Sequence, residues 1–148
     1  MSVNIQFCCG TNHLAGWHNY DQEVDIAKPL PFPNDRADYV FIEHGLEHVS
    51  GPSGLRFLDE CHRILKPGGR LRICVPVLDR LPDAHARDIV LNHGHRVVFD
   101  EGVLCRLLSL AGFKNVQSVP LDKNLDGHWR VIGEEKDVRE TLRVEVIK

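Results

Sequence analysis

Residues 37–48, ADYVFIEHGLEH, decide the fold of this chain. The first half of this stretch carries β-branched and aromatic residues with hardly any interior charge, which predicts a buried strand. The second half, EHGLEH, contains the pattern H-x-x-E-H. In one class of zinc peptidase, two histidines of this pattern lie one helical turn apart and hold the metal, and the glutamate activates water. The flanking sequence has to decide between that site and another role.

Strand patterns and helix patterns alternate along the rest of the chain. One helix is predicted over residues 55–65, with an apolar stripe at helical spacing, and KPGG ends it. A second helix is predicted over 99–113. The predicted strands cover residues 3–9, a brief segment within 23–30, 70–78, 115–121 and 142–148. Because the two kinds of element alternate, we expect an α/β fold with a mostly parallel sheet, in one domain spanning residues 1–148.

Composition narrows the kinds of partner. The chain of 148 residues is 43% hydrophobic and 26% charged, with a net charge of −3 and an isoelectric point near 6.3. That balance argues against a general phosphate-binding surface, so we expect no nucleic-acid partner. No window approaches ~18 consecutive apolar residues, so we expect no membrane span.

Cysteine usage and the N-terminus predict a cytoplasmic location. The five cysteines form no C-x-x-C pair, their number is odd, and the first residues lack the pattern of a secretory signal. We therefore expect reduced, mostly buried thiols and no zinc bound through them.

The order of short motifs resembles that of class I S-adenosylmethionine-dependent methyltransferases, and most of all a compact bacterial subgroup of that superfamily. The resemblance covers residues 3–148 and rests on IQFCCGTN, GWHNYD, DIAKPLPFPNDRADYVF, EHGLEHV, ILKPGGRLRICVPVL and HRVVFDEGVLCRLLSLAGFKNVQSV, followed by LRVEVIK. It implies a minimal Rossmann-like sheet with an antiparallel last strand. It also implies S-adenosyl-L-methionine as cofactor and methyl transfer to an unidentified N, O or S nucleophile.

The resemblance assigns cofactor contacts residue by residue. The turn at Cys9 and Gly10 follows the first strand, and a glycine there lets backbone approach a ligand closely. Asp21 is expected to accept hydrogen bonds from the ribose hydroxyls; the alternative is a turn-forming aspartate. Asp25 is expected at the adenine amino group with Ile26 against the ring; the alternative for Asp25 is a loop cap.

The same resemblance gives EHGLEH a role without metal. Gly45 lies inside the motif, where it disfavours a helix, and the motif directly follows a strand, so we expect no metal site. His44 is expected to contact the cofactor through its backbone, and its imidazole to orient or deprotonate the methyl acceptor. Glu47 is expected either in the site or as a cap of the next helix, and His48 as a structural side chain.

Two departures from the family pattern support a competing hypothesis. Cys8 stands where the first glycine of a G-x-G turn is usual, and the span from Gly10 to Asp21 is too short for the usual helix after the first strand. A catalytically degenerate binding module is therefore the alternative to an enzyme. The missing helix predicts an exposed sheet face that a second copy would cover in a homodimer.

Three residues towards the C-terminal half keep open roles. His93 and His95 lie in a loop that either contacts substrate or is a polar surface loop. Trp129 belongs either to a pocket or interface, or to the core.

Overall fold

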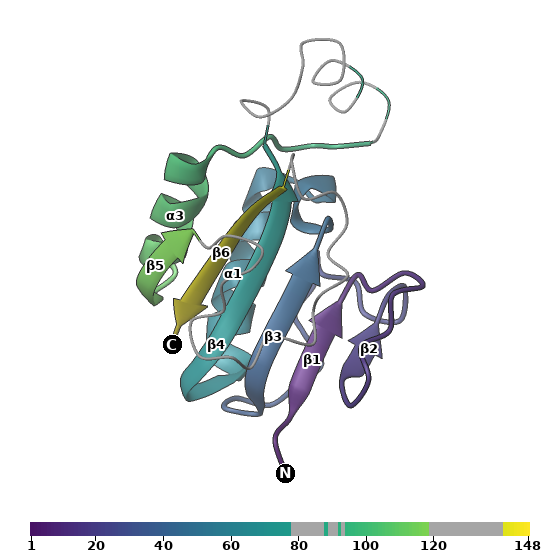
Figure 1. The fold of residues 1–148 in the computed structure, drawn as a ribbon, viewed down its shortest axis with the longest axis vertical. Helices are drawn as coiled ribbons and strands as arrows, with labels where there is room; N and C mark the ends of the chain where they lie inside the picture. The colour runs from purple at the N-terminus through teal and green to yellow at the C-terminus, as the bar shows by residue number, and fades with distance from the viewer. Residues whose placement is uncertain (78–87, 89–91, 93, 119–140) are drawn as a thin grey trace.

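The computed structural model of the chain describes residues 1–77, 88, 92, 94–118 and 141–148. It contains one six-stranded sheet with the order β2-β1-β3-β4-β6-β5 (Figure 1). The strands are β1 (Asn4–Phe7), β2 (His18–Tyr20), β3 (Ala37–Glu43), β4 (Leu65–Pro76), β5 (Lys114–Ser118) and β6 (Thr141–Ile147). The helices are η1 (Leu46–His48, a 3-10 helix), α1 (Gly51–Ile64) and α3 (Glu101–Leu110).

Strand direction confirms the predicted fold class. β2, β1, β3 and β4 run parallel to their neighbours, whereas β6 runs antiparallel to both β4 and β5. The parallel strands therefore end at the same edge of the sheet, towards the top of Figure 1. In sheets of this kind ligands bind beyond the carboxyl ends of the strands.

The main core lies between the sheet and its two helices. Alternate residues of each strand face this layer, and those of β4 are Leu71, Ile73 and Val75, all fully buried. Phe57 of α1 packs edge-on against Phe7 of β1, with ring centroids 5.5 Å apart. Burying one such side chain contributes roughly 1.5–3 kcal/mol, so these rows fix which face each strand presents.

Sequence signals define both ends of α1. The Ser50 side chain accepts a hydrogen bond from the Ser53 amide at 3.3 Å, and Pro52 occupies the first turn, where no amide is needed. The helix ends at Ile64, and KPGG belongs to β4, which corrects the prediction that the helix reaches residue 65. The apolar stripe predicted by helical spacing consists of Leu55, Leu58, Cys61, His62 and Leu65. It is partly wrong, because Leu55 is 42% exposed and the helix also buries Phe57 and Ile64.

The brief strand expected within residues 23–30 is absent. The Lys28 amide donates to the Asp25 carbonyl at 3.0 Å, and the Val24 amide donates to the Asp21 carbonyl at 3.4 Å. These local turns use the backbone groups that strand pairing would need. The segment leads instead into a proline-rich loop, residues 28–34.

No helix is present in the described connection between β1 and β2, as predicted. Leu14 and Trp17 of this connection lie on the sheet face opposite the helices, against Phe41 and Cys74. The expected uncovered face is therefore filled at this position by the connection itself. The Trp17 and Phe41 rings are 6.4 Å apart and nearly perpendicular, which is a favourable edge-to-face contact.

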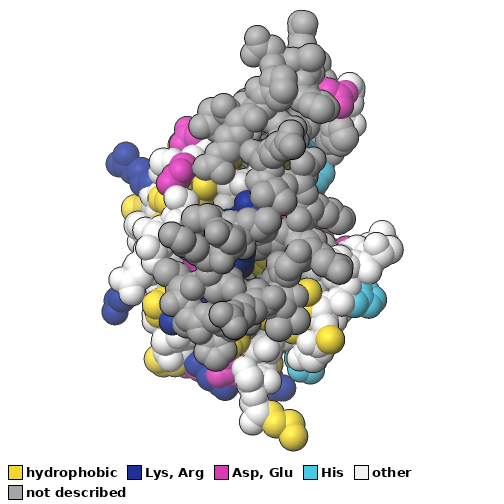
Figure 2. Space-filling model, in the orientation of Figure 1, with side chains coloured by type: hydrophobic (Ala, Val, Ile, Leu, Met, Phe, Trp, Pro, Cys, Tyr) yellow, Lys and Arg dark blue, Asp and Glu magenta, His cyan; other side chains and the backbone are white. Residues whose placement is uncertain are grey.

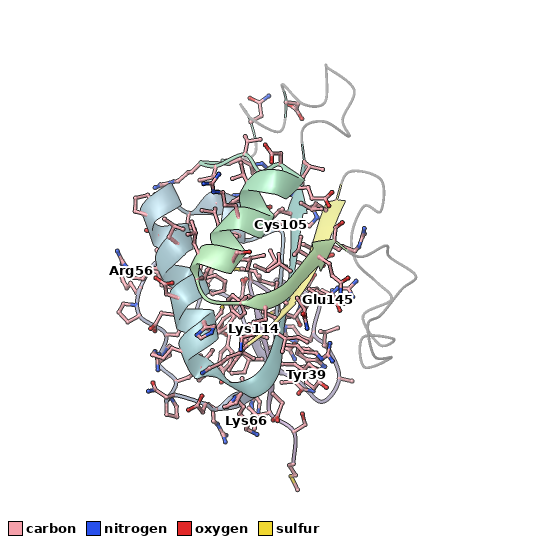
Figure 3. The ribbon with its side chains drawn as sticks, turned by 90° about the vertical axis from the view of Figure 1, so that its left-hand side faces the viewer. Tyr39, Arg56, Lys66, Cys105, Lys114 and Glu145 are labelled. Atoms are coloured by element: carbon pink, nitrogen blue, oxygen red, sulfur yellow. The ribbon has the colours of Figure 1, made fainter. Side chains whose placement is uncertain are left out.

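The face opposite the helices is more polar than the core. Arg72 of β4 and Glu145 of β6 are each 1% exposed and form an ion pair with an N–O distance of 2.6 Å. In Figure 3 Glu145 and Tyr39 lie on one side of the sheet, whereas Arg56 of α1 lies on the other. Breaking such a buried pair leaves an uncompensated charge, so it fixes the pairing of β4 with β6.

The described surface has mixed charge. On the face of the molecule seen in Figure 2, the Lys and Arg side chains of the described residues are separated from one another by polar and apolar atoms. None of the helices in the described ranges is long and apolar enough to cross a bilayer.

Candidate functional site

The candidate site lies at the carboxyl ends of β1, β2 and β3. β1 continues into Cys8, Cys9 and Gly10, while β2 continues directly into Asp21. The Cys9 amide donates to the Tyr20 carbonyl at 3.1 Å, and the Gly10 amide donates to Asp21 Oδ1 at 3.2 Å. Gly10 and Asp21, which the resemblance assigns to the same cofactor, are therefore in direct contact with each other.

Gly10 and Asp21 leave room and hydrogen-bonding capacity for a ligand. Gly10 has φ +51°, and a Cβ built on it would meet no atom within 4 Å, so the space beside its backbone is open. Asp21 Oδ2 accepts no hydrogen bond from any described residue, while its own amide donates to Glu23 Oε2 at 2.8 Å. A carboxylate held by one oxygen and open at the other suits a ligand that presents hydroxyl groups.

Cys8 is strained and packed at the same edge. Its φ is +54°, a region that costs a residue with a Cβ about 1 kcal/mol or more. Its side chain lies so close to Gly45 that a Cβ on Gly45 would be 2.7 Å from the sulfur. Burial, together with the nearby Asp21 and Glu47 carboxylates, raises the pKa of the Cys8 thiol to about 12. This raised pKa favours the neutral thiol at physiological pH.

Asp25 and Ile26 have local structural roles in the described arrangement. Asp25 Oδ1 accepts a hydrogen bond from the Ala27 amide at 2.9 Å, which is the loop-capping alternative. This bond is the main cause that lowers the pKa of Asp25. Ile26 is only 6% exposed and belongs to the main core. Leu30 is buried in the same core, and Phe32 packs partly buried against it.

EHGLEH does not form the helix that the zinc-peptidase pattern requires. His44 has φ +50°, so the chain turns sharply at the end of β3 before the short helix η1 begins. His44 Nε2 lies 3.0 Å from Thr141 Oγ1, and His44 Nδ1 lies 3.7 Å from Glu47 Oε1. Two strained residues, Cys8 and His44, thus end neighbouring strands, and such strain is characteristic of functional sites.

Glu47 is a buried acid and does not cap a helix. Ser50 caps α1, which corrects the capping role considered for Glu47. The Glu47 side chain is 1% exposed, and neither carboxylate oxygen has a hydrogen-bond partner. Burial is the main cause that raises its pKa to about 7; Glu43 adds to the effect and the amide of Glu47 itself offsets part of it.

The structure brings to the site one residue that the sequence did not indicate, Thr141, and places His95, whose role the sequence left open. Thr141 reaches His44 from β6, 97 positions along the chain, because β6 inserts beside β4. No local signal marks this contact. His95 lies beside His48, with perpendicular rings whose centroids are 4.7 Å apart. His93 and Trp129 lie outside the described residues.

Comparison with known proteins gives a consistent result. Residues 9–73 match the methyltransferase domain family. A demethylmenaquinone methyltransferase of Clavibacter sepedonicus is 32% identical in an alignment of 130 positions that covers 73% of this chain and 52% of the relative. Its counterpart in Lysinibacillus sphaericus is 49% identical over 49 residues, 33% of this chain and 20% of that relative. The chain thus spans about half, or less, of the length of these relatives.

Solved structures match the fold over almost the whole chain. A SAM-dependent methyltransferase from Archaeoglobus fulgidus has a TM-score of 0.66 and 16% identity, and the match covers 99% of this chain and 86% of the other. One from Aquifex aeolicus has a TM-score of 0.61 and 15% identity, covering 99% and 81%. At these identities the likeness concerns the fold alone.

Proposed function

We propose that the chain is a class I S-adenosylmethionine-dependent methyltransferase, which transfers a methyl group from S-adenosyl-L-methionine to an N, O or S nucleophile. The match of residues 9–73 to the methyltransferase domain family supports this, as does the similarity to methyltransferases in sequence and fold. One structural observation supports this most directly. The open space beside Gly10 and the unoccupied hydrogen-bonding capacity of Asp21 adjoin each other at the carboxyl edge of the sheet.

The residues of this edge fit the cofactor in part. Asp21 would hold the ribose hydroxyls, and the Cys9–Gly10 backbone would lie along the amino-acid portion. The cofactor supplies an activated methyl group, so the protein mainly has to hold the nucleophile in line with it. Asp25 caps its own loop and Ile26 packs in the core. To make the predicted contacts, both side chains would have to touch the cofactor while they keep these roles.

His44 is the proposed acid–base residue. Its imidazole would accept a proton from an acceptor that must lose one, and the Thr141 hydroxyl fixes the position of Nε2. Replacing His44 with alanine is expected to lower the methylation rate with little change in cofactor affinity. A loss of cofactor binding instead would assign His44 to the cofactor.

Titration calorimetry with S-adenosylmethionine and S-adenosylhomocysteine tests the proposal. We expect one cofactor per chain, and Asp21→Ala should weaken binding at least tenfold. Asp59→Ala is a matched control, since Asp59 is an exposed acid of α1. If neither compound binds near millimolar concentration, the proposal fails. Demethylmenaquinone, which names the bacterial relatives, is methylated at a ring carbon, so assaying it tests whether the acceptor class extends beyond N, O and S nucleophiles.

A specific observation favours the second candidate, a degenerate binding module. Cys8 fills space against Gly45 where the family pattern has a glycine. This alternative predicts cofactor or ligand binding without methyl transfer to any acceptor tested.

A cytoplasmic location and a homodimer belong to the same proposal. The five cysteines are all free, which suits a reducing compartment. Light scattering of the purified chain tests the dimer, because a mass of 16.8 kDa at all concentrations would exclude it.

A further inference from the structure

Glu47, His48 and His95 offer three metal-ligand atoms that all lie within 4.8 Å of one another. Two imidazoles and a carboxylate form a donor set that zinc and other first-row divalent cations accept. This set differs from the peptidase pattern, because it uses His95 from a distant segment in place of His44. The sequence alone therefore gave no reason to expect it.

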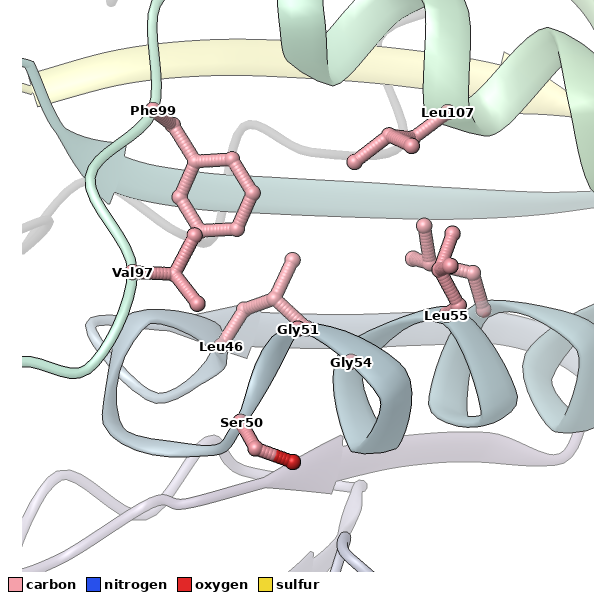
Figure 4. A pocket seen from close by; sticks show the side chains of 9 residues that line it. Leu46, Ser50, Gly51, Gly54, Leu55, Val97, Phe99 and Leu107 are labelled. Atoms are coloured by element: carbon pink, nitrogen blue, oxygen red, sulfur yellow. The ribbon is translucent and has the colours of Figure 1, made fainter.

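Backbone contacts bring the distant histidine into place. The amides of Arg96 and Val97 both donate to the Glu47 carbonyl, at 2.8 and 3.2 Å. Val97 and Leu46 also line one small apolar cavity of about 30 Å³, together with Phe99 (Figure 4). Gly94, with φ +70°, precedes His95 and lies close to the His48 ring. The segment after residue 94 is thus held against η1 by hydrogen bonds and apolar packing.

The Glu47 carboxylate supplies an independent indication of a ligand. The Glu47 side chain is only 1% exposed, yet neither of its carboxylate oxygens has a hydrogen-bond partner. A buried carboxylate without a partner is costly, and buried charges are normally paired or bound to a metal. Its Oε1 lies 3.7 Å from His44 Nδ1 and 3.8 Å from His48 Nε2, and both distances are too long for a hydrogen bond.

We propose that Glu47, His48 and His95 form a binding site for one divalent transition-metal ion of the zinc class. Binding requires the ligand atoms to approach to roughly 3.3 Å from one another, the separation set by tetrahedral bonds of about 2.0–2.1 Å. His48 is 43% exposed on its side chain, so a small rotation achieves this without repacking the core. Three protein ligands leave a fourth position for water or an exogenous ligand. The site does not depend on the proposed methyl transfer.

Zinc titration of metal-free protein tests the proposal. The chain is prepared without a histidine tag, treated with chelator and titrated with Zn²⁺ by calorimetry, in the absence of S-adenosylmethionine. We expect one Zn²⁺ per chain, and Zn²⁺ at a hundredfold excess over Kd should raise the Tm by roughly 6–10 °C. His48→Ala and His95→Ala should each weaken binding at least tenfold. His13→Ala, an exposed histidine outside the cluster, should bind Zn²⁺ as the wild type does.

A Glu47→Gln variant separates metal binding from folding. The amide has nearly the same shape and no charge to bury, so the metal-free variant should be at least as stable as the wild type. It should nevertheless lose most of the rise in Tm with Zn²⁺. Absence of Zn²⁺ binding to the wild type, or binding that survives in both His48→Ala and His95→Ala, would overturn the proposal.

Discussion

Replacing Gly45 with alanine should destabilise the protein, and removing the Cys8 side chain should reverse the effect. A Cβ on Gly45 would lie 2.7 Å from Cys8 Sγ, 2.8 Å from Cys8 Cβ and 3.0 Å from Ile42 Cδ1. Favourable contacts between such atoms lie near ~3.5–4.0 Å, so all three are too close. The backbone of Gly45 has φ −130° and ψ −38°, which is not the positive-φ region that favours glycine, so we expect crowding to be the main cost.

The expected magnitudes follow from these contacts. Overpacking of this kind costs about 1–3 kcal/mol, so we expect Gly45→Ala to lose about 2 kcal/mol. Cys8→Gly should stabilise the folded state by relieving the strained φ. It should also destabilise that state, because glycine has greater conformational freedom in the unfolded chain and because the partly buried Cys8 side chain is lost. We therefore expect it to stay within about 1 kcal/mol of the wild type. In the double variant the two contacts with Cys8 are gone, and of these three contacts the one at 3.0 Å with Ile42 Cδ1 remains.

Urea unfolding of the four proteins measures the coupling. With a slope of about 2 kcal/mol per M, Gly45→Ala should lower the midpoint by about 1 M. The coupling energy between the two positions should be at least about 1 kcal/mol. Gly51→Ala is the matched control, since a Cβ there meets no atom within 4 Å and should not lower the midpoint. The reasoning is refuted if Gly45→Ala unfolds at the wild-type midpoint, or if Cys8→Gly leaves its loss unchanged.

Three further predictions concern the cofactor edge and the loop beside α1. Cys8→Gly should increase the affinity for S-adenosylhomocysteine about tenfold, or ~1.4 kcal/mol, because it places a glycine where the family pattern has one. Cys105→Ala, the control, should leave this affinity unchanged. If calorimetry shows the same affinity for both variants, the prediction is wrong. Arg63→Met should lower the free energy of unfolding in urea by about 2–3 kcal/mol, because the Arg63 guanidinium donates hydrogen bonds to two carbonyls of the proline-rich loop and to Glu60. Arg56→Met loses one exposed hydrogen bond and should lower it by less than about 1 kcal/mol. The hydrogen bonds from Arg63 lower the pKa of Glu60 below its ordinary 4.5, so the stability from this pair is complete above pH 4.5 and is lost as the pH falls through the lowered pKa. Glu60→Gln should therefore flatten the dependence of the urea midpoint on pH below 4.5, and an unchanged slope would count against the pair.

Local sequence patterns predicted the strands and helices well where burial and backbone preference agree. Residues 37–43 form β3 as predicted, because β-branched and aromatic side chains suit a strand buried on both faces. Leu55 was wrongly included in the buried stripe of α1, because the spacing of apolar residues alone does not show which of two adjacent apolar positions of a helix faces the sheet. The prediction of a brief strand within residues 23–30 was wrong, because Asp25 accepts a hydrogen bond from the Ala27 amide and so stabilises a local turn.

The chemistry of the edge divides in the same way. The succession of motifs placed Gly10, Asp21 and His44 at strand ends, since parallel strands in one sheet end on one side. Sequence also located the substitution at Cys8, but only the fold shows that its φ is positive and that its sulfur lies against Gly45.

By itself, then, the sequence determined the order of the elements and the residues that end each strand, because these depend on side-chain type and spacing along the chain. Tertiary structure alone decided that Thr141 reaches His44, that Glu47 is buried without a hydrogen bond, and that His95 lies beside His48. These contacts join segments from 47 to 97 positions apart. They arise from strand insertion and helix packing, which bring together residues that have no local relation in the sequence.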